Sequence, residues 1–426
     1  MVRTEFYGWK LLGFLWAIVF ANLAFPIYGA SVVNAVMVQD LDFDRGTLGS
    51  LVGLFTVMSG LPGPLVAVSM NRFGVRNTLV GGSLLVVAGS VAMATVVRGS
   101  LGAMLAFGVV VGAGVAAGGV IGAQAGLARW FVRRRALVLA VISTASGVGG
   151  FMAAPLLNRW IDMTGGGWRM GWWAMAGLSA LAAAVAFVFV KERPEDLGQQ
   201  PDGGAPAKAA DGDATGANAT GKKARVHRTA EEWSSGEALA GHTYWLMMFC
   251  QMGMSCGYTV FLAHGIVHLQ DSGHTREIVA WAPSLMAFAG LFSKGIIGAW
   301  GDRIDPRYIW AGLVASFGVG IFLLADATSV SVMIAAASCM GLGFGGGVVC
   351  LATVVSNYYG VKPFAVLAGV AVAINTTLGS VVPPVTGLLY DKGHGYEGVF
   401  YVLAGWCAVG AILLTIMRPP FKKRPA

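Results

Sequence analysis

The sequence predicts an all-α membrane protein with twelve transmembrane helices in two pseudo-symmetric six-helix bundles, and three observations support this. First, the 426 residues are 56% hydrophobic and only 12% charged, whereas a soluble domain averages about 25% charged residues. Second, apolar runs of about 20 residues, the length that spans a bilayer, recur along the whole chain. Third, the two halves repeat a short basic turn. A chain of this length and composition is therefore expected to have a lipid bilayer as its solvent.

Each transmembrane helix is predicted from one apolar run, and short polar or basic turns separate the runs. The first run follows Lys10; it is longer than the core of a signal peptide and has no convincing cleavage site, so it is kept as a membrane span. Most of the 62 glycines lie inside the runs, which indicates that the helices approach one another closely. In chain order, the predicted spans are 9–36, 47–70, 77–97, 101–128, 136–160, 168–190, 242–270, 277–300, 307–325, 329–357, 363–390 and 397–418.

A polar stretch divides the chain into a first bundle at residues 1–190, a linker at 191–240, and a second bundle with a short cytoplasmic tail at 241–426. Within the linker, Gly198–Gly221 is rich in Gly, Ala, Asp and Pro and contains no aromatic residue. Such a composition cannot bury enough apolar surface to fold, so a largely disordered linker is expected. Ser235–Leu239, just before the seventh run, is expected to form a short surface helix.

The distribution of Lys and Arg predicts the orientation, because cytoplasmic loops carry an excess of both residues. With both termini in the cytoplasm, most of the 29 basic residues lie on the cytoplasmic side, including the cluster Arg129, Arg133, Arg134 and Arg135. An even number of helices agrees with termini that share a side. The expected location is the inner membrane of the cell, where the chain would be a multi-pass protein.

The repeated basic turn connects two helices in each half. Asn71–Arg76 stands between the second and third runs and Asp302–Arg307 between the eighth and ninth, and each places Arg at its second and sixth positions. Duplicated six-helix halves are typical of carriers that expose a midplane site to each side in turn. Four residues of these turns are expected to bias the inward/outward equilibrium through contacts at helix ends: Arg72, Arg76, Asp302 and Arg303.

Lys294 is the one Lys, Arg, Asp or Glu that falls well inside a predicted span. A charge at the centre of a membrane helix costs about 2.5–3.5 kcal/mol on insertion scales, so its presence requires an explanation. Lys294 lies eight residues before Asp302, about 12 Å above the cytoplasmic end of its helix. One interpretation is a lysine that extends its ammonium group to the interface beside lipid. The other is an electrostatic anchor for an anionic substrate in a central cavity, which is favoured because no acidic residue lies nearby in the sequence.

Three further polar residues are candidates for the same cavity. His264 lies seven residues before Asp271, about 10 Å below the outer end of the seventh helix. It is interpreted either as a proton-linked substrate ligand, because histidine titrates near neutral pH, or as a neutral ring that donates to a backbone carbonyl at a helix crossing. Tyr28 and Asn375 lie near mid-membrane on the first and eleventh helices and are preferred as cavity-lining residues. Other in-membrane polar groups, which either line a cavity or bridge helices, are Asn22, Asn34, Gln124, Gln251 and Tyr258.

The sequence predicts no cofactor, metal site or catalytic centre. The five cysteines all lie in apolar segments, are odd in number and lack metal-ligand spacing, so they are interpreted as small apolar fillers. Gly345–Gly347 lies inside a long apolar run with no strand before it, which argues against a nucleotide-binding loop. The net charge of +8 is explained by loops beside the membrane. Neither a nucleic-acid partner nor an enzymatic activity is expected.

A set of short motifs covers almost the whole chain outside the linker: Tyr7-Gly8-Trp9, Phe25-Pro26, Arg129–Ala136, Ser146–Gly150, His264 and Phe288–Gly298. With them, the chain resembles a major facilitator superfamily carrier, and more narrowly the branch of monocarboxylate transporters and oxalate/formate antiporters. The resemblance implies that Lys294 matches the basic residue on helix 8 that binds the substrate carboxylate, and that His264 matches the helix 7 histidine of bacterial members. The position one turn before the basic residue, often Asp or Asn, is Gly290 here and belongs to the implied substrate site.

The leading hypothesis is a secondary active transporter that moves a small organic anion, foremost a monocarboxylate, by alternating access with proton symport. Oxalate carriers use a second basic residue on helix 11 that this chain lacks, which implies one carboxylate. An aromatic residue common on helix 4 of the family is replaced among Gly118–Val120, which implies a roomier pocket and a larger acid. Two alternatives remain: an exporter of a hydrophobic small molecule and a membrane sensor that does not transport. The expected partners are the anion, protons and the lipid bilayer, and the chain is expected to function as a monomer.

Overall fold

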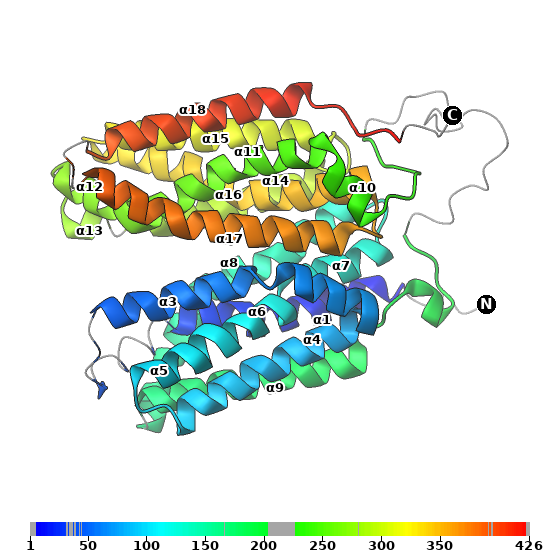
Figure 1. Ribbon diagram of the computed structural model, residues 1–426, viewed down its shortest axis with the longest axis horizontal. Helices are drawn as coiled ribbons and strands as arrows, with labels where there is room; N and C mark the ends of the chain where they lie inside the picture. Colours follow the sequence, from blue (N-terminus) through cyan, green and yellow to red (C-terminus); the bar gives the residue numbers. More distant parts are fainter. Residues whose placement is uncertain are drawn as a thin grey trace. The chain divides into compact units, whose positions relative to one another are not determined.

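The computed structural model of the chain describes residues 6–30, 33, 37, 40, 41, 43, 45–165, 167–202, 226–279, 281–390, 392 and 395–422. Within these ranges all regular secondary structure is helical. Among the described residues, ten helices are long and apolar enough to cross a membrane, and two shorter apolar stretches, Ser50–Gly60 and Arg135–Gly149, occupy the other two predicted positions. The predicted all-α membrane fold is therefore confirmed (Figure 1).

Contacts along the backbone divide the chain into two compact units. The first unit consists of Met1–Phe131, Val141–Gln200 and Ala368–Thr377, and the second of Val132–Ala140, Pro201–Leu367 and Leu378–Ala426. Each unit therefore draws most of its residues from one half of the sequence.

The first unit is built around the packing of α4 on α6 and α9. Its interior holds a chain of aromatic rings, in which Phe55 stacks on Phe107 with centroids 4.5 Å apart and Phe107 meets Trp172 edge-on. The helices are α1 (Gly8–Val19), η1 (Phe20–Gly29), α3 (Arg45–Gly60), α4 (Gly63–Thr95), α5 (Ser100–Ala103), η2 (Met104–Val111), α6 (Gly112–Gly118), α7 (Val120–Trp130), α8 (Arg135–Thr164, which begins in the second unit), α9 (Trp168–Phe189) and η3 (Pro194–Leu197).

Two glycines interrupt helices of this unit. Gly74, with φ +86°, separates the two helical parts of α4, in agreement with the turn predicted between the second and third spans. The fourth predicted span is not continuous, because Gly119 is non-helical and divides α6 from α7. Asn22 supports this break: its Nδ2 donates to Ser83 Oγ at 2.7 Å and to the carbonyl of Gly118 at 3.3 Å. A backbone group released inside a membrane needs such a partner, since lipid offers none.

The second unit is held together by close contacts between glycine-rich helices. Gly343 of α16 lies against Phe317 of α15, and Gly320 of α15 lies against the backbone of α16 at Ala336 and Met340. Its helices are α10 (Ser235–Ala240), α11 (His242–Val260), η4 (Phe261–Gly265), α12 (Ile266–Asp271), α13 (Arg276–Val279), α14 (Trp281–Trp300), α15 (Pro306–Ala325), α16 (Val330–Tyr359), α17 (Phe364–Leu389, of which Ala368–Thr377 belongs to the first unit) and α18 (Glu397–Ile416).

The described ends of the linker pack on the helices. The predicted surface helix is present as α10, which begins with a capping box in which Ser234 and Glu237 each bind the other's backbone N–H. Trp233 is buried with its ring edge-on to Tyr359. The stretch 203–225, which holds most of the predicted disordered linker, lies outside the described residues, as does Asn34.

Candidate functional site

The membrane helix α14 presents different residues to its different neighbours. Met286, Gly290, Ser293 and Ile297 are buried and recur at the three- and four-residue spacing of one helix face. This face contacts α16, where Gly346 lies close to the side chains of Ser293 and Ile297. α14 is therefore anchored to the second unit along one side.

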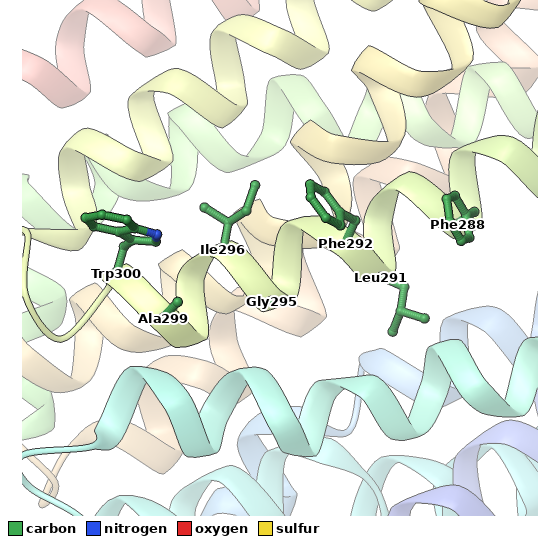
Figure 2. A pocket seen from close by; sticks show the side chains of 7 residues that line it. All are labelled: Phe288, Leu291, Phe292, Gly295, Ile296, Ala299 and Trp300. Atoms are coloured by element: carbon green, nitrogen blue, oxygen red, sulfur yellow. The ribbon is translucent and has the colours of Figure 1, made fainter.

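The other side of α14 is apolar and open. A hollow of about 500 Å³ lies there, lined by residues of this single helix. Figure 2 shows these lining residues along α14. Its large side chains are exposed, Phe288 by 63% and Phe292 by 66%, which is the character of a lipid-facing surface in a membrane protein. Lys294 is absent from its lining, which consists of Phe288, Leu291, Phe292, Gly295, Ile296, Ala299 and Trp300.

Lys294 lies between these two faces and is half-buried. Gly290 and Gly298 precede and follow it by four residues, so their directions from the helix axis bracket that of Lys294. Gly290 packs on α16, and Gly298 packs on Leu137 and Ala140 in the first turns of α8. Lys294 thus points toward the protein side of α14, which favours a role inside the protein over an ammonium group beside lipid.

Gly290 serves a close helix crossing. A Cβ at this position would lie 3.2 Å from the carbonyl oxygen of Gly341 and 3.4 Å from Cα of Gly345. Both atoms belong to the backbone of α16, so a side chain at position 290 would require this backbone to shift by a few tenths of an ångström. Gly290 therefore takes part in the packing of α14 on α16, and the hydroxyl of Ser293 donates to the carbonyl of Gly290 at 3.0 Å.

His264 makes the backbone contact that one of its two interpretations describes. Its Nε2 lies 2.9 Å from the carbonyl oxygen of Pro383. A carbonyl can only accept, so this nitrogen carries the proton. The ring also packs on Tyr396, with centroids 5.2 Å apart. His264 is thus held between α17 and the start of α18.

Tyr28 and Asn375 belong to the first unit, whereas Lys294 and His264 belong to the second. Tyr28 follows Pro26 in the widened helix η1 and is 37% exposed. Asn375 donates its Nδ2 to the carbonyl of Ala371 at 2.8 Å, within its own helix.

The predicted gating turn of the first unit is organised by Glu192, which is not among the site residues predicted from the sequence. Its carboxylate accepts from the backbone N–H of Val75 at 3.1 Å and of Arg76 at 2.8 Å, and it pairs with Arg129 at 3.1 Å. A carboxylate at the start of a helix is favourable, because the free N–H groups there carry partial positive charge. Arg72, by contrast, is exposed with its guanidinium over Phe73.

Asp302 has the corresponding role in the second unit. It accepts from the N–H of Ala136 at 3.1 Å and of Leu137 at 3.2 Å, at the start of α8, and it pairs with Arg228 at 3.3 Å. Burial raises the pKa of Asp302, and these hydrogen bonds and Arg228 oppose the rise. The prediction that Asp302 contacts a helix end agrees with this geometry, while Arg303 is exposed.

Both described ends of the linker form hydrogen bonds with the loop before α8. Asp202 accepts from the N–H groups of residues 132, 133 and 134 at 2.6–3.2 Å. Arg228 donates to the carbonyl of Arg133 at 3.1 Å. Next to this loop, the buried Arg135 donates to the carbonyl of Ser356 at 3.0 Å. The basic cluster is therefore part of the folded structure.

In the part of the chain that the structure describes, no group of three His, Cys, Asp or Glu side chains is close enough together to hold a metal ion. The five cysteines are free thiols, and four of them are buried.

The chain is similar to a known protein family and to several known proteins. The sequence matches the profile of the Major Facilitator Superfamily over residues 14–275 and 245–426. It is 23% identical to monocarboxylate transporter 3 of Rattus norvegicus over 96% of this chain and 79% of that protein. It is also 23% identical to the MFS transporter asaE of Aspergillus flavus, over 83% of this chain and 73% of that protein. The crystal structure of the human organic anion transporter MFSD10 (TETRAN) covers 96% of this chain and 98% of its own, with TM-score 0.64 and 20% identity, and so has the same fold.

Proposed function

Because this chain belongs to the Major Facilitator Superfamily, we propose that it is a secondary active transporter that moves a small organic anion, specifically a monocarboxylate, across the inner membrane by alternating access. The observation that carries this proposal is the position of Lys294, a half-buried cation inside the membrane helix α14 and off its lipid-facing strip. A cation in such a place attracts an anion strongly, because little water screens it. The monocarboxylate transporters among the relatives support the choice of anion.

The orientation in the membrane, the bundle boundaries and the monomeric state are proposed from the sequence. Most Lys and Arg residues lie in the loops that we assign to the cytoplasm, so we propose that both termini lie there. We place the bundle boundaries at 1–190 and 241–426 and propose that a monomer suffices for transport. The contact between His264 and Pro383 favours helix packing over proton transfer for His264, so we assign no proton path to it.

Lys294→Met tests the proposal, since methionine keeps the length and apolar stem but removes the charge. A hydrogen bond to a charged group contributes about 1.5–3 kcal/mol, so the affinity for the carboxylate should fall roughly 10- to 100-fold. Lys294→Arg should retain most of it. The measurement is uptake of a labelled monocarboxylate into proteoliposomes over a range of concentrations.

Lys362→Met is the matched control, because Lys362 is exposed and pairs with the exposed Glu232 in the same unit. Its uptake should equal that of the unmodified chain. Uptake with unchanged affinity in Lys294→Met would refute the anchor role. Flux of hydrophobic compounds but of no carboxylate would favour an exporter, and no flux of any solute would favour a sensor.

A further inference from the structure

We propose that the transported anion is an aromatic carboxylate, whose ring stacks on the side-chain pair Tyr258 and Phe344 while its carboxylate binds Lys294. This inference rests on the proposed role of Lys294 and specifies the class of acid. Three features of the second unit carry it: the geometry of the aromatic pair, the shared orientation of Phe344 and Lys294, and the polar character of the helix face that bears Tyr258.

Tyr258 of α11 and Phe344 of α16 form a parallel stack. Their ring centroids lie 3.9 Å apart and their planes differ by 4°. Both side chains are half-buried, unlike the core aromatics Phe317 and Trp310. Gly343 and Gly345 flank Phe344 along the chain, so its immediate neighbours in sequence carry no side chain. The pair is a flat aromatic surface, which a further ring can extend by offset stacking.

The relative height of Lys294 and Phe344 follows from two contacts between α14 and α16. Gly341 packs on Met286 and Gly345 packs on Gly290, and both contacts have the same offset in residue number, so the two helices run in the same direction. Phe344 is therefore level with the residue before Gly290, five residues above Lys294. This corresponds to about 7.5 Å along the helix. Both side chains lean toward the N-termini of these parallel helices, and the longer lysine side chain extends further in that direction.

The same contacts show that both side chains leave the helix pair on one side. At about 100° per residue, Lys294 is turned about 40° from Gly290 in one sense, and Phe344 is turned about 100° from Gly345 in the other. Because the helices are parallel and face one another, opposite turns bring both side chains to the same side of the pair. A short acid with an aryl group can thus place its carboxylate at Lys294 and its ring beside Phe344.

Tyr258 lies on the polar face of α11. Gln251, Ser255 and Tyr258 follow the spacing of one helical face, while Gly253, on the opposite face, packs on Trp406 of α18. Gln251 is buried, its Nε2 is 3.5 Å from Ser255 Oγ, and its Oε1 has no hydrogen-bond partner in the described part of the chain. Polar groups inside a membrane protein face a cavity rather than lipid, and a buried acceptor of this kind is normally satisfied by water or ligand.

The experiment compares phenylacetate with cyclohexylacetate, which have similar size and the same carboxylate but differ in the aromatic ring. Their affinities for the purified full-length protein are measured by isothermal titration calorimetry. Stacking should make phenylacetate bind about two- to tenfold more tightly. Phe344→Leu should bring this ratio close to one, because it removes the ring on which the aryl group stacks.

Phe292→Leu is the matched control, because Phe292 is 66% exposed on the lipid-facing strip of α14, and it should keep the original ratio. The ratio in the unmodified protein is itself decisive, whether or not the Phe344 variant folds. Equal affinities for the two acids, lost together in Lys294→Met, would overturn the aromatic specificity and leave the proposed function standing. Failure of both acids to bind would overturn the specificity and count against the proposed function as well.

Discussion

The crossing of α14 and α16 leaves no room for a side chain at Gly345, so Gly345→Ala tests the packing of the second unit directly. A Cβ at Gly345 would overlap Cα and the carbonyl oxygen of Gly290 and lie 2.7 Å from its carbonyl carbon. These are backbone atoms, which cannot turn aside as a flexible side chain can. Overpacking of this kind costs about 1–3 kcal/mol, and we expect the free energy of unfolding to fall by that amount relative to a matched control.

The control is Gly295→Ala on α14, where an added Cβ meets no atom within 4 Å. Both substitutions replace a helical Gly by Ala and share the gain of about 0.5–1 kcal/mol from lower backbone entropy, so their difference isolates the steric cost. The assay is unfolding by SDS in mixed micelles, followed by tryptophan fluorescence. Equal stability of the two variants would refute the close approach of Gly290 and Gly345.

Two further predictions concern the ends and breaks of helices. Asn22→Ala should lower the free energy of unfolding by about 1–3 kcal/mol, because the buried carbonyl of Gly118 loses its side-chain donor; the same SDS titration measures this, and unchanged stability would contradict the support role. For Asp302, burial raises the pKa, so the folded protein binds this proton more readily than the unfolded chain. The stability of the protein relative to Asp302→Asn should therefore increase as the pH falls from 7 through the raised pKa. Thermal unfolding at pH 7 and pH 5 measures this difference. A decrease in relative stability at the lower pH would show that the folded protein favours the carboxylate.

The helical architecture could be predicted from the sequence because lipid permits little else for long apolar runs. The break at Gly119 could not, since a run of small apolar residues reads as one continuous span. It becomes visible only when the side chain of Asn22 is placed beside Gly118, 96 residues later in the chain. Hydropathy measures the medium around a helix but carries no information about partners that are distant in sequence.

A candidate site residue can be predicted from the sequence when its side chain costs free energy inside a membrane, as a charged group does. Lys294 stands out because a charge there needs an explanation, whereas Phe344 reads as one more apolar residue. Glu192 was overlooked because a carboxylate in a polar linker is ordinary, and its role depends on the backbone turn at Gly74 that folding brings to it. Gly290 is a candidate only through the family resemblance, and its close neighbour on α16 cannot be inferred from local sequence.

The hydrogen bond from Arg135 to the carbonyl of Ser356 has a consequence for biogenesis. Arginines beside a membrane span help to fix its orientation during insertion, and here one of them is later built into the finished protein. The first task needs only positive charge, while the second uses the planar guanidinium group. Arg135→Lys should therefore insert with normal topology, as judged by cysteine labelling from either side, and yet yield a less stable protein. Early synthesis and final folding thus draw on the same residue for different properties.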